Sequence, residues 1–304
     1  MKYLIIGAGG VGGSLCAFMH EAGLDVTLIA RGEHLLSIQH NGLKMQTTLK
    51  GDYTLFPIKA CTMEECHEQP DVIFVCVKGY SIKDTIAFIQ HIAHKQSVVI
   101  PLLNIYGTGG MMHKKLPQLL VTDGCVYIAA EIKEPGTILQ AGDIFRVVFG
   151  VRHQEEYRPI LKIIAEDLNA SGIRGILSEN IQKDAFQKFS FVSPIAACGA
   201  YFDVTIEAMQ KEGKERLMAI ALMKEVMSVA TALGISLNKD TLEKNLAILD
   251  ALAPTASTSM QRDLKKGGLS EMEGLIFEVL CLGKQHHLAL PLYEKVAQKF
   301  SFKQ

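Results

Sequence analysis

The sequence predicts an α/β protein, with a Rossmann-like, mostly parallel sheet over residues 1–177 and an all-α region over residues 178–304. Three observations lead to this prediction. The chain opens with a short apolar strand that runs directly into a glycine-rich turn. Strand and helix patterns then alternate through the first half. From Glu179 onward the strand patterns nearly stop, and apolar residues recur at helical spacing.

The opening turn has the G-x-G-x-x-G pattern, in the residues Gly7, Ala8, Gly9, Gly10, Val11 and Gly12. In this pattern Gly7 permits the tight turn, Gly9 lets the backbone approach a pyrophosphate, and Gly12 lets helix and strand pack closely. The first N–H groups of the following helix are available to phosphates. With strands over residues 3–6 and 26–30, the pattern predicts a dinucleotide site. The alternative is a glycine turn without a ligand in another α/β protein.

The end of the second strand indicates which dinucleotide binds. An NAD site typically has an acidic residue here to bind the ribose 2′-hydroxyl, whereas this chain has Ala30-Arg31-Gly32. A guanidinium is suited to a 2′-phosphate, so Arg31 favours NADP(H). The alternative is an ordinary solvated arginine.

The remaining elements are predicted in chain order. Residues 42–58 suggest a small hairpin or insertion. Strands are expected over residues 71–77, 97–103, 124–131 and 146–149, and helices over residues 81–93, 106–116 and 154–170. Their alternation predicts one open, mostly parallel sheet. Helices follow over residues 180–200, 205–233, 240–252, 255–265, 270–285 and 292–300.

Composition narrows the functional classes. The net charge is −1 and no basic stripe is present, which argues against a nucleic-acid partner. No apolar run is long enough to cross a membrane, and the start of the chain lacks the features of a signal peptide, so a cytoplasmic location is expected. The seven cysteines are irregularly spaced, as expected in a reducing compartment. Cys61, Cys66 and His67 lack a fourth ligand and zinc-type spacing, so no metal site is predicted.

Several polar residues stand where a ligand could meet them. Lys78 and Asn104 each follow an apolar strand, although a solvated lysine and a turn-forming asparagine are the simpler explanations. Lys188 lies on an apolar helix, where a lysine must either find a partner or extend to solvent. In a cleft, burial would lower its pKa and make it a usable proton donor. Ser259 and Glu271 bracket a loop. Because Ser270 and Glu273 fit a capping box, Glu271 could also be a first-turn acid.

Taken in order, these features resemble the ketopantoate reductase (2-dehydropantoate 2-reductase) family over essentially the whole chain. The shared markers are G-A-G-G-V-G, Arg31, V-x-V-K at Lys78, Asn104, F-Q-K at Lys188, S-M-x-x-D at Ser259, S-E-M-E at Glu271 and H-H-L-A-L-P at residues 286–291. The resemblance implies that Lys188 protonates the nascent alkoxide and that Glu271 hydrogen-bonds a substrate hydroxyl. It also implies that Ser259 contacts the substrate carboxylate and that Lys78 and Asn104 lie against the nicotinamide. Asn104 is further expected to contact the substrate, and Glu271 the cofactor.

The sequence departs from the family pattern at the substrate side. The family usually has asparagines where this chain has Val192, Ala196 and Ile276, and it has glycine directly after the position of Asn104, where this chain has Ile105. A pocket that cannot pair a substrate hydroxyl discriminates differently among substrates. The reaction class is therefore better supported than the substrate.

Together these features predict one activity, with two alternatives. The predicted activity is NADPH-dependent reduction of a small 2-oxo acid, with 2-dehydropantoate as the leading substrate and pantothenate synthesis as its context, in a cleft between the two regions. One alternative is a reductase for a more apolar 2-oxo acid. The other is a non-catalytic NADP-binding regulatory protein, which would not need Lys188 or Glu271. The apolar helices after residue 177 could also hide a homodimer interface.

Overall fold

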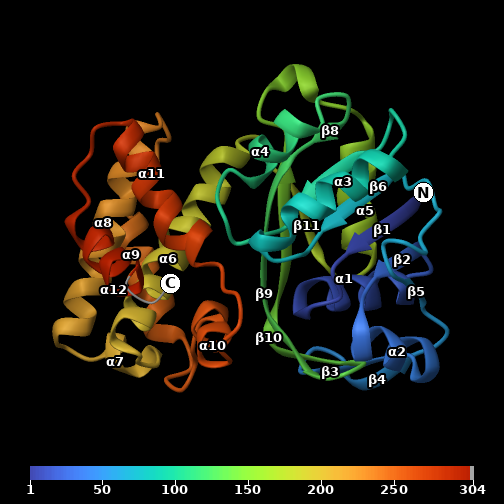
Figure 1. Ribbon diagram of the computed structural model, residues 1–304, viewed down its shortest axis with the longest axis horizontal. Helices are drawn as coiled ribbons and strands as arrows, with labels where there is room; N and C mark the ends of the chain where they lie inside the picture. The colour runs from blue at the N-terminus through green and yellow to red at the C-terminus, as the bar shows by residue number, and fades with distance from the viewer. Residues whose placement is uncertain (302–304) are drawn as a thin grey trace. The chain divides into compact units, whose positions relative to one another are not determined.

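The computed structural model describes residues 1–301, which form two compact units (Figure 1). The first unit contains Met1–Leu103 and Gly107–Ile181, and the second contains Asn104–Tyr106 together with the chain from Gln182 onward. The first unit is built on sheets and the second is helical, which confirms the predicted fold class. That Asn104–Tyr106 groups with the helices was not predicted. The functional division into residues 1–177 and 178–304 stays a prediction.

The main sheet of the first unit has six strands. Their spatial order is β5 (Lys59–Cys61), β2 (Asp25–Ile29), β1 (Lys2–Ile6), β6 (Val72–Val75), β7 (Val98–Pro101) and β8 (Leu120–Val121). Every neighbouring pair is parallel. From β1 the chain first moves outward through β2 and β5, then returns to the other side of β1 at β6. Ligands of doubly wound sheets bind beyond the carboxyl ends of the strands at this reversal.

A second sheet contains two strands that the sequence predicts in the main sheet. Residues 124–131 and 146–149 lie in a long antiparallel hairpin, β9 (Asp123–Glu134) and β10 (Thr137–Gly150). The other edge of β10 pairs in parallel with β3 (Leu43–Thr47) and, further along, with β11 (Arg174–Leu177). The expectation of a single sheet was wrong because the pairing of β10 with β3 joins residues far apart in the chain. The predicted hairpin over residues 42–58 is confirmed as β3 and β4 (Gly51–Leu55).

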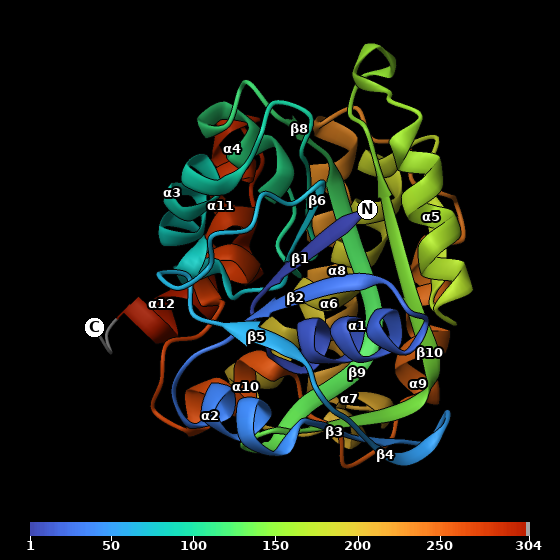
Figure 2. The same ribbon diagram turned by 90° about the vertical axis from the view of Figure 1, so that its right-hand side faces the viewer.

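Helix α1 (Gly10–Glu21) lies between these two sheets (Figure 2). It packs on β1 and β2 on one side and on β9 and β10 on the other. Phe18 of its buried face packs edge-on against Phe145 of β10, with 5.2 Å between ring centroids. The glycine-rich turn at the start of α1 is therefore held from both sides. The unit is completed by α2 (Gly32–Asn41), α3 (Ile82–Ile92), α4 (Thr108–Lys115), α5 (Ile160–Ala170) and the 3₁₀ turns Gly79–Ser81 and Gln154–Glu156.

The second unit packs its helices around one apolar core. Its elements are α6 (Ile181–Phe202), α7 (Ile206–Gln210), α8 (Lys214–Ala232), α9 (Thr241–Ala251), α10 (Ser259–Lys265), the π-helical turn η3 (Glu273–Phe277), α11 (Glu278–Gln285) and α12 (Pro291–Ser301). Residues from α6, α8 and α12, among them Phe186, Val226 and Val296, are buried together. In the described part of the chain, no helix is both long enough and apolar enough to cross a membrane.

Two predicted helices are interrupted. The helix expected over residues 205–233 divides into α7 and α8, with Gly213 at the N-cap of α8. Glycine is a poor helix former, so a break costs little there. The helix expected over residues 154–170 starts as a 3₁₀ turn, and α5 begins only after Pro159. Proline disfavours a helical backbone at the residue before it, which explains the interruption.

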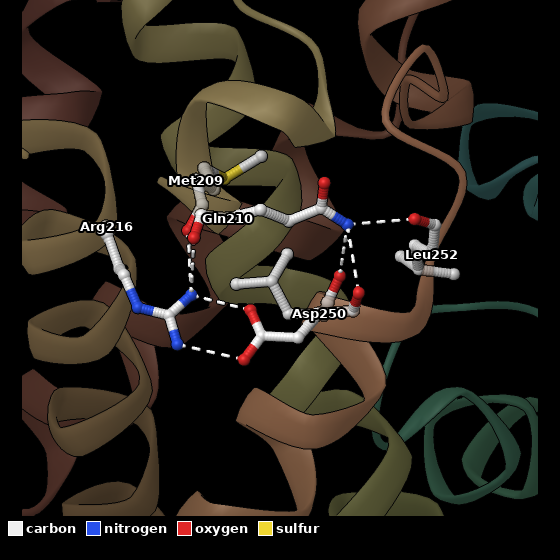
Figure 3. A network of polar contacts seen from close by, with 6 residues as sticks. Met209, Gln210, Arg216, Asp250 and Leu252 are labelled. Atoms are coloured by element: carbon white, nitrogen blue, oxygen red, sulfur yellow. Dashed lines mark hydrogen bonds and ion pairs between the residues drawn. The ribbon is translucent and has the colours of Figure 1, made fainter. Parts of the chain in front are cut away.

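A polar network joins α7, α8 and α9 (Figure 3). The Arg216 guanidinium donates to both carboxylate oxygens of Asp250, at 2.6 and 3.0 Å, and to the carbonyls of Met209 and Gln210. The Gln210 amide donates to the carbonyls of Leu249, Asp250 and Leu252. The last carbonyls of a helix lack partners within the helix, so these side chains cap the C-terminal ends of α7 and α9.

Candidate functional site

The glycine-rich turn has the geometry that its sequence predicts. Gly7 has φ +104°, a conformation that other residues rarely adopt. A Cβ on Gly12 would lie 1.9 Å from the Gly7 carbonyl oxygen, so only glycine fits at this contact. A Cβ on Gly9 would meet no heavy atom within 4 Å. Gly9 is also the N-cap of α1, and its helix has no side-chain cap. The open space therefore lies beside helix N–H groups that can bind an anion.

Gly10 is constrained in a different way. A Cβ at Gly10 would lie 2.2 Å from the carbonyl oxygen of Ala130 in β9, and one at Gly13 would lie 2.7 Å from Ile138 of β10. These two glycines let α1 approach the second sheet. The sequence pattern did not indicate this packing role, because the partner strands lie more than a hundred residues away.

Arg31 and Lys78 follow two strands that flank β1 on either side. Arg31 is exposed at the N-cap of α2, two residues beyond the end of β2. Lys78 lies three residues beyond β6, at the N-cap of the 3₁₀ turn Gly79–Ser81, and not directly at the strand end as predicted. The intervening residues Cys76 and Val77 would lie about 3 Å from a Cβ on Gly7. The carboxyl ends of β2, β1 and β6 thus bring Arg31, Gly7 and Lys78 to one edge of the sheet.

His34 lies near the glycine-rich turn, and the sequence did not identify it as a candidate residue. It lies on α2, and its Nδ1 accepts a hydrogen bond of 2.9 Å from the Gly136 N–H in the β9–β10 turn. Burial lowers the pKa of the imidazole, and the nearby Ala8 backbone partly offsets this effect. A neutral ring with Nδ1 as acceptor fits the contact with Gly136. No local sequence signal marks this histidine, since its partners are distant in the chain.

In the helical unit, the structure brings two of the predicted residues together. The Lys188 Nζ on α6 donates a 2.6 Å hydrogen bond to Oδ1 of Asn104. Lys188 is half-buried, and the neighbouring Phe186 and Phe189 on the same helix pack against each other with 5.7 Å between ring centroids. The bond orients the amide so that the Asn104 oxygen faces the ammonium and its NH₂ group points elsewhere. Lys188 therefore has a fixed position at a half-buried site and does not extend into bulk solvent.

The segment that carries Asn104 is fixed by its next two residues. The ring of Tyr106 packs edge-on against Phe186, with 4.7 Å between centroids. The Ile105 side chain lies over Gly274, where a Cβ would come within 2.4 Å of it. Asn104–Tyr106 therefore bridges the helix of Lys188 and the turn that follows Glu271. The sequence placed Asn104 at the end of a strand, but β7 ends at Pro101.

Ser259 is the first residue of α10, and a capping box sets its position. The Thr258 hydroxyl accepts from the Gln261 N–H, and the Gln261 side chain accepts from the Thr258 N–H. Gln261 also donates to the Val204 carbonyl at 2.8 Å. A Cβ at Gly199 of α6 would come within 2.5 Å of this side chain. The capping box thus fixes the start of α10 against α6.

Glu271 precedes a π-helical turn. Its side chain is buried, with 4% exposure, and its carbonyl accepts from the Leu275 N–H at 3.0 Å. The predicted capping box of Ser270 and Glu273 was wrong, because the N-cap of the turn is Met272 and has no side-chain cap. A π-turn has no sequence signature comparable to a capping box, although such turns are frequent at functional sites.

Two of the residues that replace family asparagines belong to the core. Ala196 and Ile276 are 1% and 0% exposed and pack in the apolar cluster of the helical unit. Val192 is half-buried, one turn after Lys188 on α6. Of the three replacements, Val192 is therefore the one whose side chain is accessible to a ligand.

Cysteine and histidine residues do not gather into a metal centre. Within residues 1–301, no group of three or more His, Cys, Asp or Glu side chains is arranged to hold a metal ion. Cys61 and Cys66 are in hydrogen-bonding contact, and burial raises the pKa of the Cys61 thiol to about 12. Both thiols are free.

Comparisons with known proteins show which family the chain resembles over its length. A family model described as ketopantoate reductase PanE/ApbA matches residues 3–154, and the model of its C-terminal region matches residues 180–304. The chain is 26% identical over 296 residues to an uncharacterised oxidoreductase, YkpB, of Bacillus subtilis (strain 168), covering 97% of this chain and 96% of that protein. It is 24% identical to a 2-dehydropantoate 2-reductase of Mesorhizobium japonicum, covering 93% and 92% of the two chains.

Solved structures share the fold at low sequence identity. D-mandelate dehydrogenase with NADH and anilino(oxo)acetate superimposes with a TM-score of 0.88 at 22% identity, covering 98% of this chain and 96% of that one. A dimeric ketopantoate reductase from Staphylococcus aureus gives a TM-score of 0.83 at 20% identity, with coverages of 99% and 97%.

Proposed function

We propose that this chain, which belongs to the ketopantoate reductase family of oxidoreductases, uses NADPH to reduce a small 2-oxo acid at C2. The leading substrate is 2-dehydropantoate, which would give pantoate for pantothenate synthesis. The observation that carries the proposal is the Lys188–Asn104 hydrogen bond of 2.6 Å, which holds an ammonium at a half-buried position in the helical unit.

The residues of the first unit fit a dinucleotide cofactor. The open space at Gly9 and the uncapped start of α1 suit a pyrophosphate, with Ala8, Gly10 and Val11 completing the turn. Arg31 at the end of β2 suits a 2′-phosphate, which favours NADPH over NADH. Family members use NAD(P)H, and the mandelate dehydrogenase structure contains NADH, so the choice between the two cofactors depends on Arg31. When bound, the reduced nicotinamide supplies the hydride.

The chain's own residues then act on the substrate. As hydride reaches C2, negative charge develops on the carbonyl oxygen, and the Lys188 ammonium stabilises this charge and donates the proton. Asn104 keeps Nζ in place through its Oδ1 and can present its NH₂ group to a ligand. Ser259 at the start of α10 binds the substrate carboxylate, and Glu271 accepts a hydrogen bond from a substrate hydroxyl. Lys78 lies on the cofactor side.

A second candidate substrate is a 2-oxo acid with an apolar side chain. Ile105 favours it, because its side chain packs between the Asn104 position and the turn after Glu271, where the family has glycine. The half-buried Val192 adds a further apolar surface on the helix of Lys188. The fold-level relationship to D-mandelate dehydrogenase, found with anilino(oxo)acetate, is consistent with this candidate.

One matched pair of substrates separates these possibilities. 2-Dehydropantoate and 3,3-dimethyl-2-oxobutanoate differ only by a hydroxyl group, and NADPH oxidation reports the reduction of either. A site that pairs the hydroxyl should prefer 2-dehydropantoate in kcat/KM by at least about tenfold. Equal or better use of the deoxy compound supports the apolar substrate. No oxidation with either compound, or with a wider panel of 2-oxo acids, favours the non-catalytic regulatory protein.

Location and assembly also stay proposals. A cytoplasmic location is expected from the sequence. A homodimer is proposed because a dimeric ketopantoate reductase shares the fold. Sedimentation of the purified protein at micromolar concentration tests the dimer directly.

A further inference from the structure

The π-helical turn η3 is supported from within the core of the helical unit. The turn begins two residues after Glu271, and the Leu275 N–H within it donates to the Glu271 carbonyl. The carbonyl of the same Leu275 accepts a 2.6 Å hydrogen bond from Oγ of Ser193 on α6. The Ser193 hydroxyl thus adds a side-chain donor from α6 to a carbonyl inside the turn, where the backbone departs from α-helical pairing of N–H and C=O groups.

Tyr293 completes this support. Its hydroxyl lies 2.6 Å from the Ser193 Oγ, and both side chains are fully buried, with 0% exposure. Serine has one hydroxyl hydrogen, which goes to the Leu275 carbonyl, so Tyr293 must be the donor to Ser193. Burial raises the pKa of the Tyr293 phenol well above its usual value. The phenol therefore stays protonated and remains a donor throughout the working pH range.

The backbone of Tyr293 is fixed as well. The Glu225 carboxylate on α8 accepts from the N–H groups of Leu292 and Tyr293, at 2.9 and 3.1 Å, and so caps the start of α12. A continuous series of hydrogen bonds thus runs from α8 through α12 and α6 to the turn behind Glu271. The turn cannot shift without breaking a buried bond in this series.

We propose that Ser193 and Tyr293 are positioning residues that hold the π-helical turn, and through it the Glu271 carboxylate, in the geometry the reaction needs. This inference rests on the proposed function, in which Glu271 binds the substrate. Ser193 lies on α6 five residues after Lys188. The helix that carries the proton donor therefore also fixes the turn that carries the second functional group.

The structure offers a matched control for testing this role. Ser190 is also on α6 and fully buried. Its Oγ donates to the Gln187 carbonyl at 2.8 Å and accepts from Asn245 at 3.0 Å. Ser193→Ala and Ser190→Ala each delete one buried hydroxyl that donates to a carbonyl and accepts one bond. Only the first deletion frees the π-turn, so a difference between the two variants cannot come from general loss of stability.

The kinetic test is a double-mutant cycle with Glu271→Gln. Ser193→Ala should lower kcat/KM for the 2-oxo acid about tenfold in the wild-type background, but less than about twofold in Glu271→Gln, because its effect passes through Glu271. Ser190→Ala should change kcat/KM by the same small factor in both backgrounds. Tyr293→Phe should show the same coupling as Ser193→Ala with a smaller loss of kcat/KM. It also serves as the test variant if Ser193→Ala fails to fold. Equal effects of Ser193→Ala or Tyr293→Phe in both backgrounds would overturn the proposal.

Amide hydrogen exchange provides a readout that does not depend on turnover. Ser193→Ala or Tyr293→Phe should speed exchange in residues 271–277, whereas Ser190→Ala should not. Unchanged exchange in this segment would overturn the proposal. If the wild-type protein reduced no 2-oxo acid, the proposed function would fail. In that case the exchange comparison alone would decide whether Ser193 and Tyr293 hold the turn.

Discussion

Replacing Gly9 with alanine should separate cofactor binding from folding. Gly9 has φ −70° and ψ −171°, which alanine adopts without strain, and its Cβ would meet no protein atom within 4 Å. Alanine is a weaker N-cap than glycine by up to about 1 kcal/mol. The lower entropy of the unfolded chain offsets about 0.4–1 kcal/mol of this. The free energy of unfolding should therefore change by less than about 1 kcal/mol, and Tm by no more than about 3 °C.

The same methyl group should weaken NADPH binding, because it would occupy the space at the start of α1 that we assign to the pyrophosphate. Displacing the phosphate costs at least one charge-assisted hydrogen bond, or about 1.5–3 kcal/mol. This corresponds to an increase in Kd of about tenfold to a hundredfold. Fluorescence titration with NADPH measures the Kd, and calorimetry measures the Tm.

Two other glycines serve as references for this experiment. Gly110→Ala places a Cβ on α4 with no heavy atom closer than 3.9 Å, and it should alter neither Kd nor fold. Gly12→Ala would force a Cβ to within 1.9 Å of the Gly7 carbonyl oxygen, and it should prevent correct folding. An unchanged NADPH Kd in a folded Gly9→Ala variant would refute the assignment of this space to the pyrophosphate.

Three further perturbations test other parts of the account. Arg31→Ala should raise the Kd for NADPH at least tenfold, because it removes one charged contact, and it should leave the Kd for NADH nearly unchanged. Equal increases in the two Kd values would exclude a contact between Arg31 and the 2′-phosphate. Arg216→Ala should lower the unfolding free energy by roughly 1 kcal/mol without affecting NADPH affinity, since its partner Asp250 is largely exposed; calorimetry showing no loss would contradict the network's capping role. Because the pKa of His34 is lowered in the folded state, the unfolded chain takes up its proton first as pH falls below about 6.5, so stability is lost on acidification. His34→Gln should reduce the drop in Tm between pH 7 and 5, and an identical drop in both proteins would exclude this contribution.

The features that the sequence predicted are those encoded by neighbouring residues. The glycine turn, the buried parallel strands and the helix of Lys188 each carry a local pattern of spacing or hydrophobicity. Their order along the chain was enough to predict both the fold class and the family. The functional roles assigned to Lys188, Glu271 and Ser259 stay predictions, although the structure places Lys188 and Asn104 in direct contact.

The features that were missed depend on residues distant in the chain. Asn104 follows an apolar run and was read as a strand end, whereas Ile105 and Tyr106 pack on the helical unit. The second sheet was missed because β10 pairs with β3, a strand that lies far earlier in the chain. Likewise, the bond from Ser193 to the Leu275 carbonyl spans 82 residues. Contacts of this kind follow from the packing of complete elements, which local periodicity does not describe.

We propose that Lys188 supplies the proton for reduction of a 2-oxo acid. The most direct measurement is kcat for Lys188→Ala, together with its NADPH Kd and with Lys183→Ala as a control on the same helix, where the lysine bonds to Asn238 at 2.9 Å. Loss of the general acid should lower kcat by at least about a hundredfold while the NADPH Kd stays nearly constant. Lys183→Ala should retain full activity. A Lys188→Ala protein that turned over at the wild-type rate would contradict the account.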